Sequence, residues 1–147
     1  MSLNQMLMTV PPERVFEVLT DPTAYGEWVV GAHSVRGADD RWPDKGSRFH
    51  HRVGGGPFTL RDHTEVVDIV VPRRLQLRAR ARPFGTAMVT VEVQRDGDGG
   101  SRVLMTEDGA DPFTRLALGN PVSQRLLFAR NAESLRRLKR LVEQPSA

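Results

Sequence analysis

Val10-Pro-Pro-Glu-Arg-Val-Phe-Glu-Val-Leu-Thr-Asp-Pro-Thr-Ala-Tyr-Gly-Glu-Trp28 is the stretch of this sequence that decides the fold. Pro11 and Pro12 suit the start of a helix, because the backbone N–H that proline lacks would have no partner in a first turn. Asp21-Pro22 then ends this helix, since the residue before a proline avoids the α region. The stretch therefore predicts a short helix with a defined start and end.

The pattern continues in both directions from this helix. A short strand is predicted over 3–9, and a second short helix over 23–28. Within the first helix, apolar residues at helical spacing indicate the buried face. They are Val15, Phe16, Val18 and Leu19.

Alternating apolar and polar residues predict six more strands. They are expected over 33–38, 47–53, 58–70, 74–82, 86–94 and 102–108. The clearest alternation lies in the fifth strand of the chain, where Leu75 and Leu77 face one way and Arg78 the other. One apolar and one charged face are typical of an antiparallel sheet with one side in water. The pattern slips at Val66-Val67, which predicts a β-bulge.

The last helix is predicted over 121–143, after a loop over 109–120 that holds a single helical turn. Its inward face is aliphatic along the second half and mixed with polar residues along the first half. The members of this face are Gln124, Leu127, Phe128, Asn131, Ser134, Leu135, Leu138, Leu141 and Val142. We expect the aliphatic half to seal the core and the mixed half to form the wall of a cavity.

Length and composition indicate one domain, which we place at 1–147. Hydrophobic residues make up 39% and charged residues 27%, as in soluble globular proteins. No apolar run approaches the ~20 residues of a membrane span, and the start lacks the pattern of a secretory signal, so we expect no membrane insertion. The chain has no cysteine, which excludes disulfides and thiol catalysis, and we expect a cytoplasmic location.

The formal net charge of +3 is small, although arginine makes the sequence pI about 10.1. Nearly every cation is arginine, a usage that fits a high-GC bacterial genome. The cations cluster near Arg73 and near Arg136. Binding to phosphates needs clustered cations rather than a small surplus, and we interpret both clusters as solvated outer faces. We therefore expect no nucleic-acid partner.

Several local motifs mark turns and core positions of one fold. They are Pro12-x-x-Val15-Phe16-x-x-Leu19-x-Asp21-Pro22 leading to Trp28, Gly46-x-x-Phe49, Val71-Pro72-Arg73-Arg74-Leu75 and Leu135-x-x-Leu138. From Met6 to Glu143 the chain resembles the START/Bet v 1-like superfamily, in particular its bacterial polyketide cyclase/dehydrase-like branch. The resemblance implies an α+β helix-grip fold, in which a seven-stranded antiparallel sheet curves around a long C-terminal helix and two short helices follow strand one. It also implies a hydrophobic cavity between sheet and helix.

The preferred functional hypothesis is that this cavity binds a small hydrophobic molecule, such as a lipid, polyketide or aromatic metabolite, with little or no catalysis and no cofactor. An apolar pocket with a few placed polar groups is the usual form of a ligand site. The residues expected to line it are Trp28, Phe49, Phe58, Leu60, Leu75, Leu77, Ala79, Val89, Val91, Met105, Gln124, Leu127, Phe128 and Asn131.

The alternative is a polyketide cyclase, aromatase or dehydratase. His51 and Asp62 lie on neighbouring predicted strands, and the alternation puts both on the cavity side. A histidine beside a carboxylate can act as a general base with an orienting partner, which enolisation, aldol closure or dehydration of a polyketone would use. A one-residue slip in strand phase would instead turn both side chains to water.

Other polar residues of the predicted interior allow two interpretations each. Gln124, Asn131 and Ser134 either form ordinary hydrogen bonds within a half-buried helix or orient a carbonyl or hydroxyl of a ligand. Glu107, predicted to point inward, and Arg130 either lie at the cavity rim or form a surface pair.

Two tryptophans and the last helix leave further alternatives. Trp28 either packs against the small end of the sheet or serves as a stacking platform. Trp42, in a turn-rich loop, is a lid or an interface residue. A third functional hypothesis is a protein-interaction module, such as a homodimer through Leu126 and the arginine face of the last helix. A fully packed interior would favour it.

Motifs of other site classes do not occur in the sequence. The histidines show neither H-x-x-x-H nor H-x-E spacing, so we expect no metal site. Gly54-Gly55-Gly56 lacks the lysine and the following helix of a phosphate-binding loop. No G-x-S-x-G is present, which argues against a serine hydrolase.

Overall fold

Seven antiparallel strands form one sheet in the order β1-β7-β6-β5-β4-β3-β2. The computed structural model describes residues 2–30, 32–55, 58–80 and 86–144, with side chains except those of 32–36, 51–55, 58–62, 113 and 117–118. The strands are β1 (Ser2–Met8), β2 (Ala32–Ala38), β3 (Arg48–Gly55), β4 (Phe58–Val70), β5 (Arg74–Arg80), β6 (Thr86–Asp96) and β7 (Gly100–Gly109). The helices are α1 (Pro12–Leu19), η1 (Pro22–Ala24), α2 (Tyr25–Trp28), α3 (Pro112–Leu118) and α4 (Pro121–Glu143). This confirms the predicted helix-grip α+β class.

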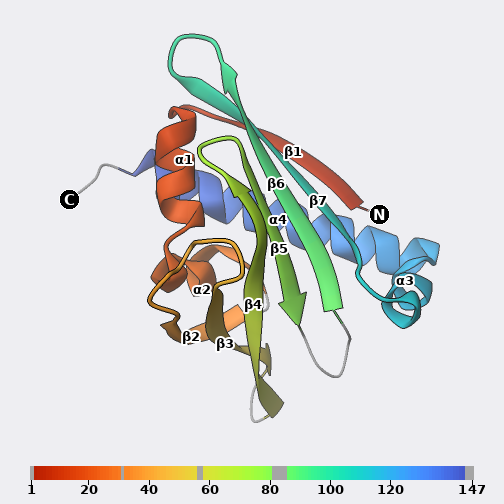
Figure 1. The fold of residues 1–147 in the computed structure, drawn as a ribbon. Coiled ribbons are helices and arrows are strands. Elements are labelled where there is room, and N and C mark those ends of the chain that lie inside the picture. Colours follow the sequence, from red (N-terminus) through yellow and green to blue (C-terminus); the bar gives the residue numbers. More distant parts are fainter. Residues whose placement is uncertain (1, 31, 56–57, 81–85, 145–147) are drawn as a thin grey trace.

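The sheet and α4 form two layers. Figure 1 shows α4 running behind the sheet, with α1 and α2 at one of its ends and α3 at the other. α4 packs against β1, α1 and α2. The face of β5 and β6 turned toward the viewer in Figure 1 has no helix over it, as the charged outer face of these strands requires.

The stretch that decides the fold begins and ends its helix as predicted. Pro12 is the first residue of α1, and Val15 and Phe16 are buried. The helix stops before Asp21, whose carboxylate accepts a hydrogen bond of 2.9 Å from the N–H of Thr23 and thereby caps η1. The short 3-10 segment is followed directly by α2, where one helix was predicted over 23–28.

Alternation of buried and more exposed residues holds along β1, β5 and β7. Leu75 and Leu77 are buried in β5, whereas Arg78 is exposed. The register between β4 and β5 shifts between Val66 and Asp68, which confirms the bulge. The strand corresponding to β5 was predicted to extend to residue 82, and residues 81–82 lie outside the described residues. One face of β1, of β5 and of β7 is therefore turned to the interior.

The connection before α4 differs from the prediction. A seven-residue helix, α3, replaces the single turn that was expected there. The Asp111 carboxylate accepts a hydrogen bond of 2.7 Å from the N–H of Thr114, and Pro112 occupies the first helical position. Asp-Pro at a helix start is a local signal with a known mechanism, and the sequence analysis did not use it.

The last helix has the predicted bounds, and Asn120 caps it by accepting a hydrogen bond of 2.8 Å from Ser123 N–H. Leu135, Leu138 and Val142 are fully buried. The prediction that Phe128 belongs to the inward face is wrong, because Phe128 is 52% exposed. It follows buried Leu127 and is thus turned away from it by roughly 100°. Among the described residues, no helix has both the length and the apolar character that crossing a membrane requires.

Truncating Leu138 to alanine should lower the free energy of unfolding by about 2–5 kcal/mol, because Leu138 is fully buried and alanine leaves a cavity. Urea denaturation followed by circular dichroism measures the loss. The matched control is Leu126→Ala on the same helix, where the side chain is 68% exposed and the change should stay within about 0.5 kcal/mol. Equal losses for the two variants would contradict the observed seating of α4.

Candidate functional site

Polar side chains gather inside the fold where α2, β4, β7 and α4 meet. We call this group the buried polar cluster. Its members are Tyr25, Trp28, Thr64, Glu107, Arg130 and Asn131. Trp28, Thr64, Glu107 and Asn131 are buried, Tyr25 is partly buried, and Arg130 is exposed. Polar groups in such a place need partners, so the partners of each member decide what the cluster can do.

Tyr25 is the centre of the cluster. Its ring lies 4.5 Å from that of Phe49 and 5.9 Å from that of Trp28, both edge-on. Burial raises the pKa of the Tyr25 phenol, a hydrogen bond with Thr64 opposes this, and the nearby charges of Glu107 and Arg130 act in opposite directions. The phenol is therefore a buried, protonated group between aromatic rings and an ion pair.

Glu107 and Arg130 form that ion pair. Nη2 of Arg130 lies 2.5 Å and 2.6 Å from the two carboxylate oxygens of Glu107. The Glu107 side chain is 6% exposed, whereas that of Arg130 is 42% exposed. The pair thus reaches from the interior to the surface, and it combines the two interpretations that the sequence left open. A buried carboxylate without such a partner would be strongly destabilising.

Two donors of the cluster are without a partner. Within the described residues, neither Nε1 of Trp28 nor Nδ2 of Asn131 makes a hydrogen bond, and each residue is only 2% exposed. Oδ1 of Asn131 accepts from Arg130 Nη2 at 3.4 Å, which is consistent with the amide nitrogen pointing away from the ion pair. Buried donors without partners are uncommon in folded proteins and call for an explanation.

The three polar residues predicted on the inward face of α4 take different roles. Ser134 is buried and its hydroxyl accepts a hydrogen bond of 3.1 Å from Val30 N–H, so it joins the segment after α2 to the helix. Gln124 lines a surface groove with Leu3. Asn131 alone of the three belongs to the buried polar cluster.

The predicted apolar lining residues are mostly interior. Buried members are Trp28, Phe49, Leu75, Leu77, Val91, Met105 and Leu127, and half-buried members are Ala79 and Val89. Phe128 is the exception described above, since it lies half exposed in the same surface groove as Gln124. The side chains of Phe58 and Leu60 lie outside the described set.

His51 and Asp62 are direct partners in the antiparallel register of β3 and β4. Position 51 follows buried Phe49 by two residues, and position 62 precedes buried Thr64 by two. The side chains of both residues lie outside the described set, so the structure brings the two backbone positions together and says nothing of the chemistry between them.

Trp42 packs against the aromatic rings formed by Tyr25, Trp28 and Phe49, through its contact with Phe49. Its ring lies 4.7 Å from that of Phe49, and its Nε1 donates a hydrogen bond of 2.8 Å to the carbonyl oxygen of Thr20. The turn-rich loop is therefore held against the end of α1. Trp42 thus has a structural role that neither sequence interpretation, lid or interface, had included.

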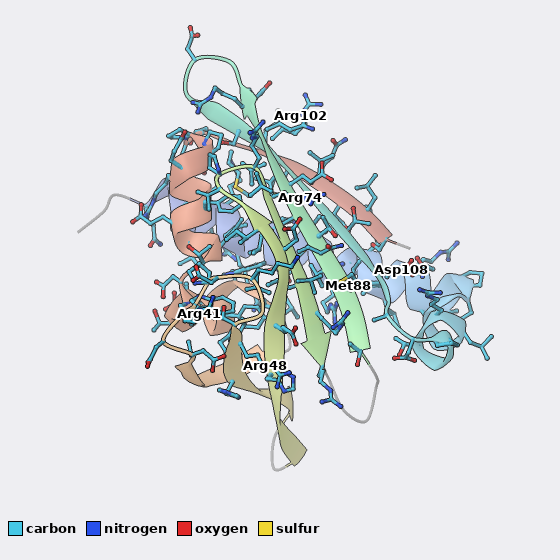
Figure 2. All side chains as sticks on the ribbon, viewed as in Figure 1. Arg41, Arg48, Arg74, Met88, Arg102 and Asp108 are labelled. Atoms are coloured by element: carbon cyan, nitrogen blue, oxygen red, sulfur yellow. The ribbon has the colours of Figure 1, made fainter. Side chains whose placement is uncertain are left out.

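Two surface grooves lie away from the cluster. One, of about 700 Å³, is lined among others by Pro72, Arg73 and Arg95, and the other, of about 720 Å³, by residues 38–41 and 45–47. Figure 2 also labels Met88 and Asp108, which are register partners on β6 and β7 and line neither of these two grooves. Within the described part of the chain, no three histidine, aspartate or glutamate side chains are arranged to hold a metal ion.

Neither Tyr25 nor Thr64 was predicted to belong to the site. Tyr25 precedes Trp28 by three residues, which puts the two on one side of a short helix. It is also the one tyrosine of the chain. Helical spacing from Trp28 was a usable signal, whereas the hydrogen bond to Thr64 joins segments far apart in sequence and leaves no local pattern.

Comparisons with known proteins agree with this architecture. A family model described as polyketide cyclase/dehydrase and lipid transport matches residues 5–143. Curated proteins yield no match. Solved structures from Nitrosomonas europaea, Mesorhizobium loti and Rhodobacter sphaeroides are 18%, 18% and 21% identical, with TM-scores of 0.72, 0.70 and 0.71. They cover 97%, 99% and 95% of this chain and 93%, 98% and 90% of their own. At these identities the likeness shows the fold alone.

Ultraviolet titration of the phenolate reports on Tyr25 alone, since it is the one tyrosine. At about pH 10 the native protein should show less phenolate than the unfolded chain, because burial raises the pKa of this phenol. Above about pH 10 the folded state keeps a proton that the unfolded chain has lost, so stability should fall as the pH rises further.

Three further titrations complete this experiment. Thr64→Val removes a hydrogen bond that lowers the pKa and should raise it further, whereas Glu107→Gln removes a negative charge and should lower it. The protein unfolded in urea should titrate at about pH 10. A native midpoint equal to the unfolded one would show that Tyr25 is not buried as described.

Proposed function

Because the chain belongs to the polyketide cyclase/dehydrase and lipid transport family, we propose that it binds a small hydrophobic molecule with at least one hydrogen-bond acceptor, between the sheet and α4. The observation that carries the proposal is the pair of buried donors without partners, on Trp28 and Asn131. The proposed ligand provides the acceptor that the described residues do not provide at these two groups.

The apolar side chains on the inner face of the sheet support the proposal that the ligand is hydrophobic. Leu75, Leu77, Val91 and Met105 are buried on the inward face of β5, β6 and β7. A ligand that displaces water from such side chains gains about 25 cal/mol for each Å² of apolar area that it buries. Ala79, on the same face of β5, is half-buried and has a small side chain.

The two buried donors without a described partner support the proposal that the ligand carries a hydrogen-bond acceptor. A buried N–H without a partner costs about 1–3 kcal/mol, and a ligand oxygen placed near it recovers part of that cost. Trp28 contributes its donor from α2 and Asn131 from α4, so an oxygen between them would be held from two elements. A carbonyl oxygen, which has two lone pairs, meets this requirement.

Tyr25 and Glu107 extend the polar side of the site. The Tyr25 phenol keeps its proton, because burial raises its pKa, and it therefore remains a donor. The Glu107 carboxylate is an acceptor that Arg130 holds in place. A ligand with both a carbonyl and a hydroxyl group could use both kinds of partner.

Catalysis is the second candidate, and the register of β3 and β4 favours it. The backbone positions of His51 and Asp62 are opposite one another, where their Cα atoms lie about 4.5–5.5 Å apart in an antiparallel ladder. A histidine and a carboxylate at such positions could take a proton from the carbon between two carbonyls. The protein would then be a cyclase, aromatase or dehydratase acting on a polyketone.

Binding of fluorenone and fluorene tests the binding proposal, because the two probes have similar ring systems and only fluorenone has a carbonyl. Quenching of tryptophan fluorescence and calorimetry measure the affinities. Fluorenone should bind about tenfold more tightly than fluorene, which corresponds to one additional hydrogen bond. Asn131→Leu should remove this preference and leave the affinity for fluorene unchanged.

The matched control is Gln124→Leu on the same helix, which should preserve the preference because Gln124 lines a surface groove. If neither probe binds to the unmodified protein, the proposed function is wrong. If both bind equally well, the protein has an apolar site without the proposed acceptor recognition.

Deuterium exchange into heptane-2,4,6-trione tests for catalysis. An enzyme should accelerate exchange at the carbons between the carbonyls above the buffer rate, as measured by NMR. His51→Gln should abolish this acceleration and leave fluorenone affinity unchanged, because the histidine would act on a proton and not in binding. Exchange at the buffer rate with the unmodified protein would reject the catalytic hypothesis and leave the binding proposal in place.

A further inference from the structure

The strand β1 lies at one edge of the sheet. On one side it pairs with β7 along all seven of its residues. On the other side, the described residues make no backbone hydrogen bond to residues 2–8. Its sequence, Ser-Leu-Asn-Gln-Met-Leu-Met, has no charge, no proline and no glycine. An uncharged, regular edge of this kind is a template for pairing with another strand.

The opposite edge of the sheet is protected by contrast. β2 is contacted by η1 and α2. Its ladder with β3 is interrupted by register shifts on both sides of Val35, and its sequence includes Arg36 and Gly37. Irregular ladders, charges and covering elements are the usual means of preventing edge pairing. Both edge strands are contacted by helices, β1 by α4 on its inner face. The irregular ladder and the charge occur at β2, whereas β1 has a regular ladder and an uncharged sequence.

The side chains of β1 extend the same asymmetry. Ser2, Asn4 and Met8 are buried on the face toward α4. Leu3 and Leu7 lie on the outer face and are each 54% exposed. About half of the surface of each of these two leucines is therefore open to solvent.

We infer that β1 pairs with β1 of a second copy of this chain, antiparallel about a two-fold axis through Gln5. Such an axis keeps the outer faces of both sheets on the same side, so residues of equal parity must be opposite one another. Among these registers, the one centred on Gln5 pairs all seven residues. It sets Leu3 of each copy against Leu7 of the other, and apolar pairs at directly opposite positions stabilise an antiparallel ladder.

A second copy fits this edge better than an unrelated strand because the edge is complementary to itself. One set of contacts is repeated by symmetry, as in most homodimers. The nearest charged neighbour on the outer face is Arg102 on β7, the register partner of Leu7 (Figure 2). The two-fold axis puts the two copies of Arg102 about 13 Å apart along the strands and three strand spacings apart across them, so they do not repel at close range.

A groove beside the edge adds apolar surface to the proposed interface. It has a volume of about 310 Å³ and is lined by Ser2, Leu3, Gln124, Arg125 and Phe128. Phe128, half exposed there, belongs to α4, and its carbonyl oxygen accepts a hydrogen bond of 3.1 Å from Asn4 of β1. The second copy of β1 would lie next to Leu3 at this groove. The inference concerns the outer edge and is independent of the interior ligand.

Disulfide trapping tests the register directly, because the chain has no cysteine of its own. In Gln5→Cys the thiol lies on the proposed axis and meets its own copy at a Cα separation of about 4.5–5.5 Å, within the range that a disulfide needs. Mild oxidation should give a covalent dimer. The control is Gln94→Cys, an exposed glutamine of β6, which should remain monomeric on a denaturing gel.

Sedimentation equilibrium measures the association itself. The unmodified protein should be a dimer, and Leu7→Lys should raise its dissociation constant about tenfold or more by placing a charge against Leu3 of the other copy. Leu116→Lys, at an exposed position of α3, should leave the constant unchanged. Circular dichroism of each variant verifies folding, which the exposure of Leu7 should preserve.

Three results would overturn the proposal. The unmodified protein is a monomer at all concentrations; or Gln5→Cys forms no more covalent dimer than Gln94→Cys; or Leu126→Lys dissociates the dimer and Leu7→Lys does not. The last result would place the interface on the outer face of α4 instead.

Discussion

The attachment of the C-terminal end of α4 is the constraint on which the rest of the structure depends. The guanidinium of Arg14, in α1, donates to the carbonyl oxygens of Val142 and Leu141 at 3.1 Å and 3.3 Å. The Glu143 carboxylate accepts hydrogen bonds from the N–H and the hydroxyl of Thr9 at 2.8 Å and 2.7 Å. The last carbonyl groups of a helix have no partner within it, so these bonds satisfy groups that burial would leave unpaired. They also join the helix to the connection between β1 and α1.

With its end held, α4 determines where polar groups meet inside the protein. The buried Leu135 and Leu138 hold the helix against the core. Arg130 and Asn131 lie one to two turns before these leucines in the same helix. Arg130 then reaches Glu107 on β7, which allows that carboxylate to be buried. Asn131 is left with a donor that no described residue satisfies. The same seating that stabilises the fold therefore creates the polar features from which a binding function is proposed.

Much of the architecture follows from short-range signals. Asp21-Pro22 ends α1, alternation identifies the strands, and the slip at Val66-Val67 marks the bulge, because each of these depends on a few neighbouring residues. The α3 helix was not predicted, although Asp111 and Pro112 are a local signal for a helix start. The exposure of Phe128 was not predictable in the same way. It lies at the border of the inward stripe, where the seating of the helix against β1 decides burial.

The sequence by itself determined the class of fold, the order of its elements and most of the apolar residues that fill the interior, because periodicity and turn chemistry are properties of the local chain. Only the tertiary structure decided that Glu107 pairs with Arg130, that Tyr25 bonds to Thr64, and that Ser134 bonds to Val30. It also left the amide nitrogen of Asn131 without a hydrogen bond among the described residues. These relations join residues far apart in sequence. Hydrogen bonds and ion pairs act over a few ångströms, and which groups come that close is set by how the helix and the sheet pack together.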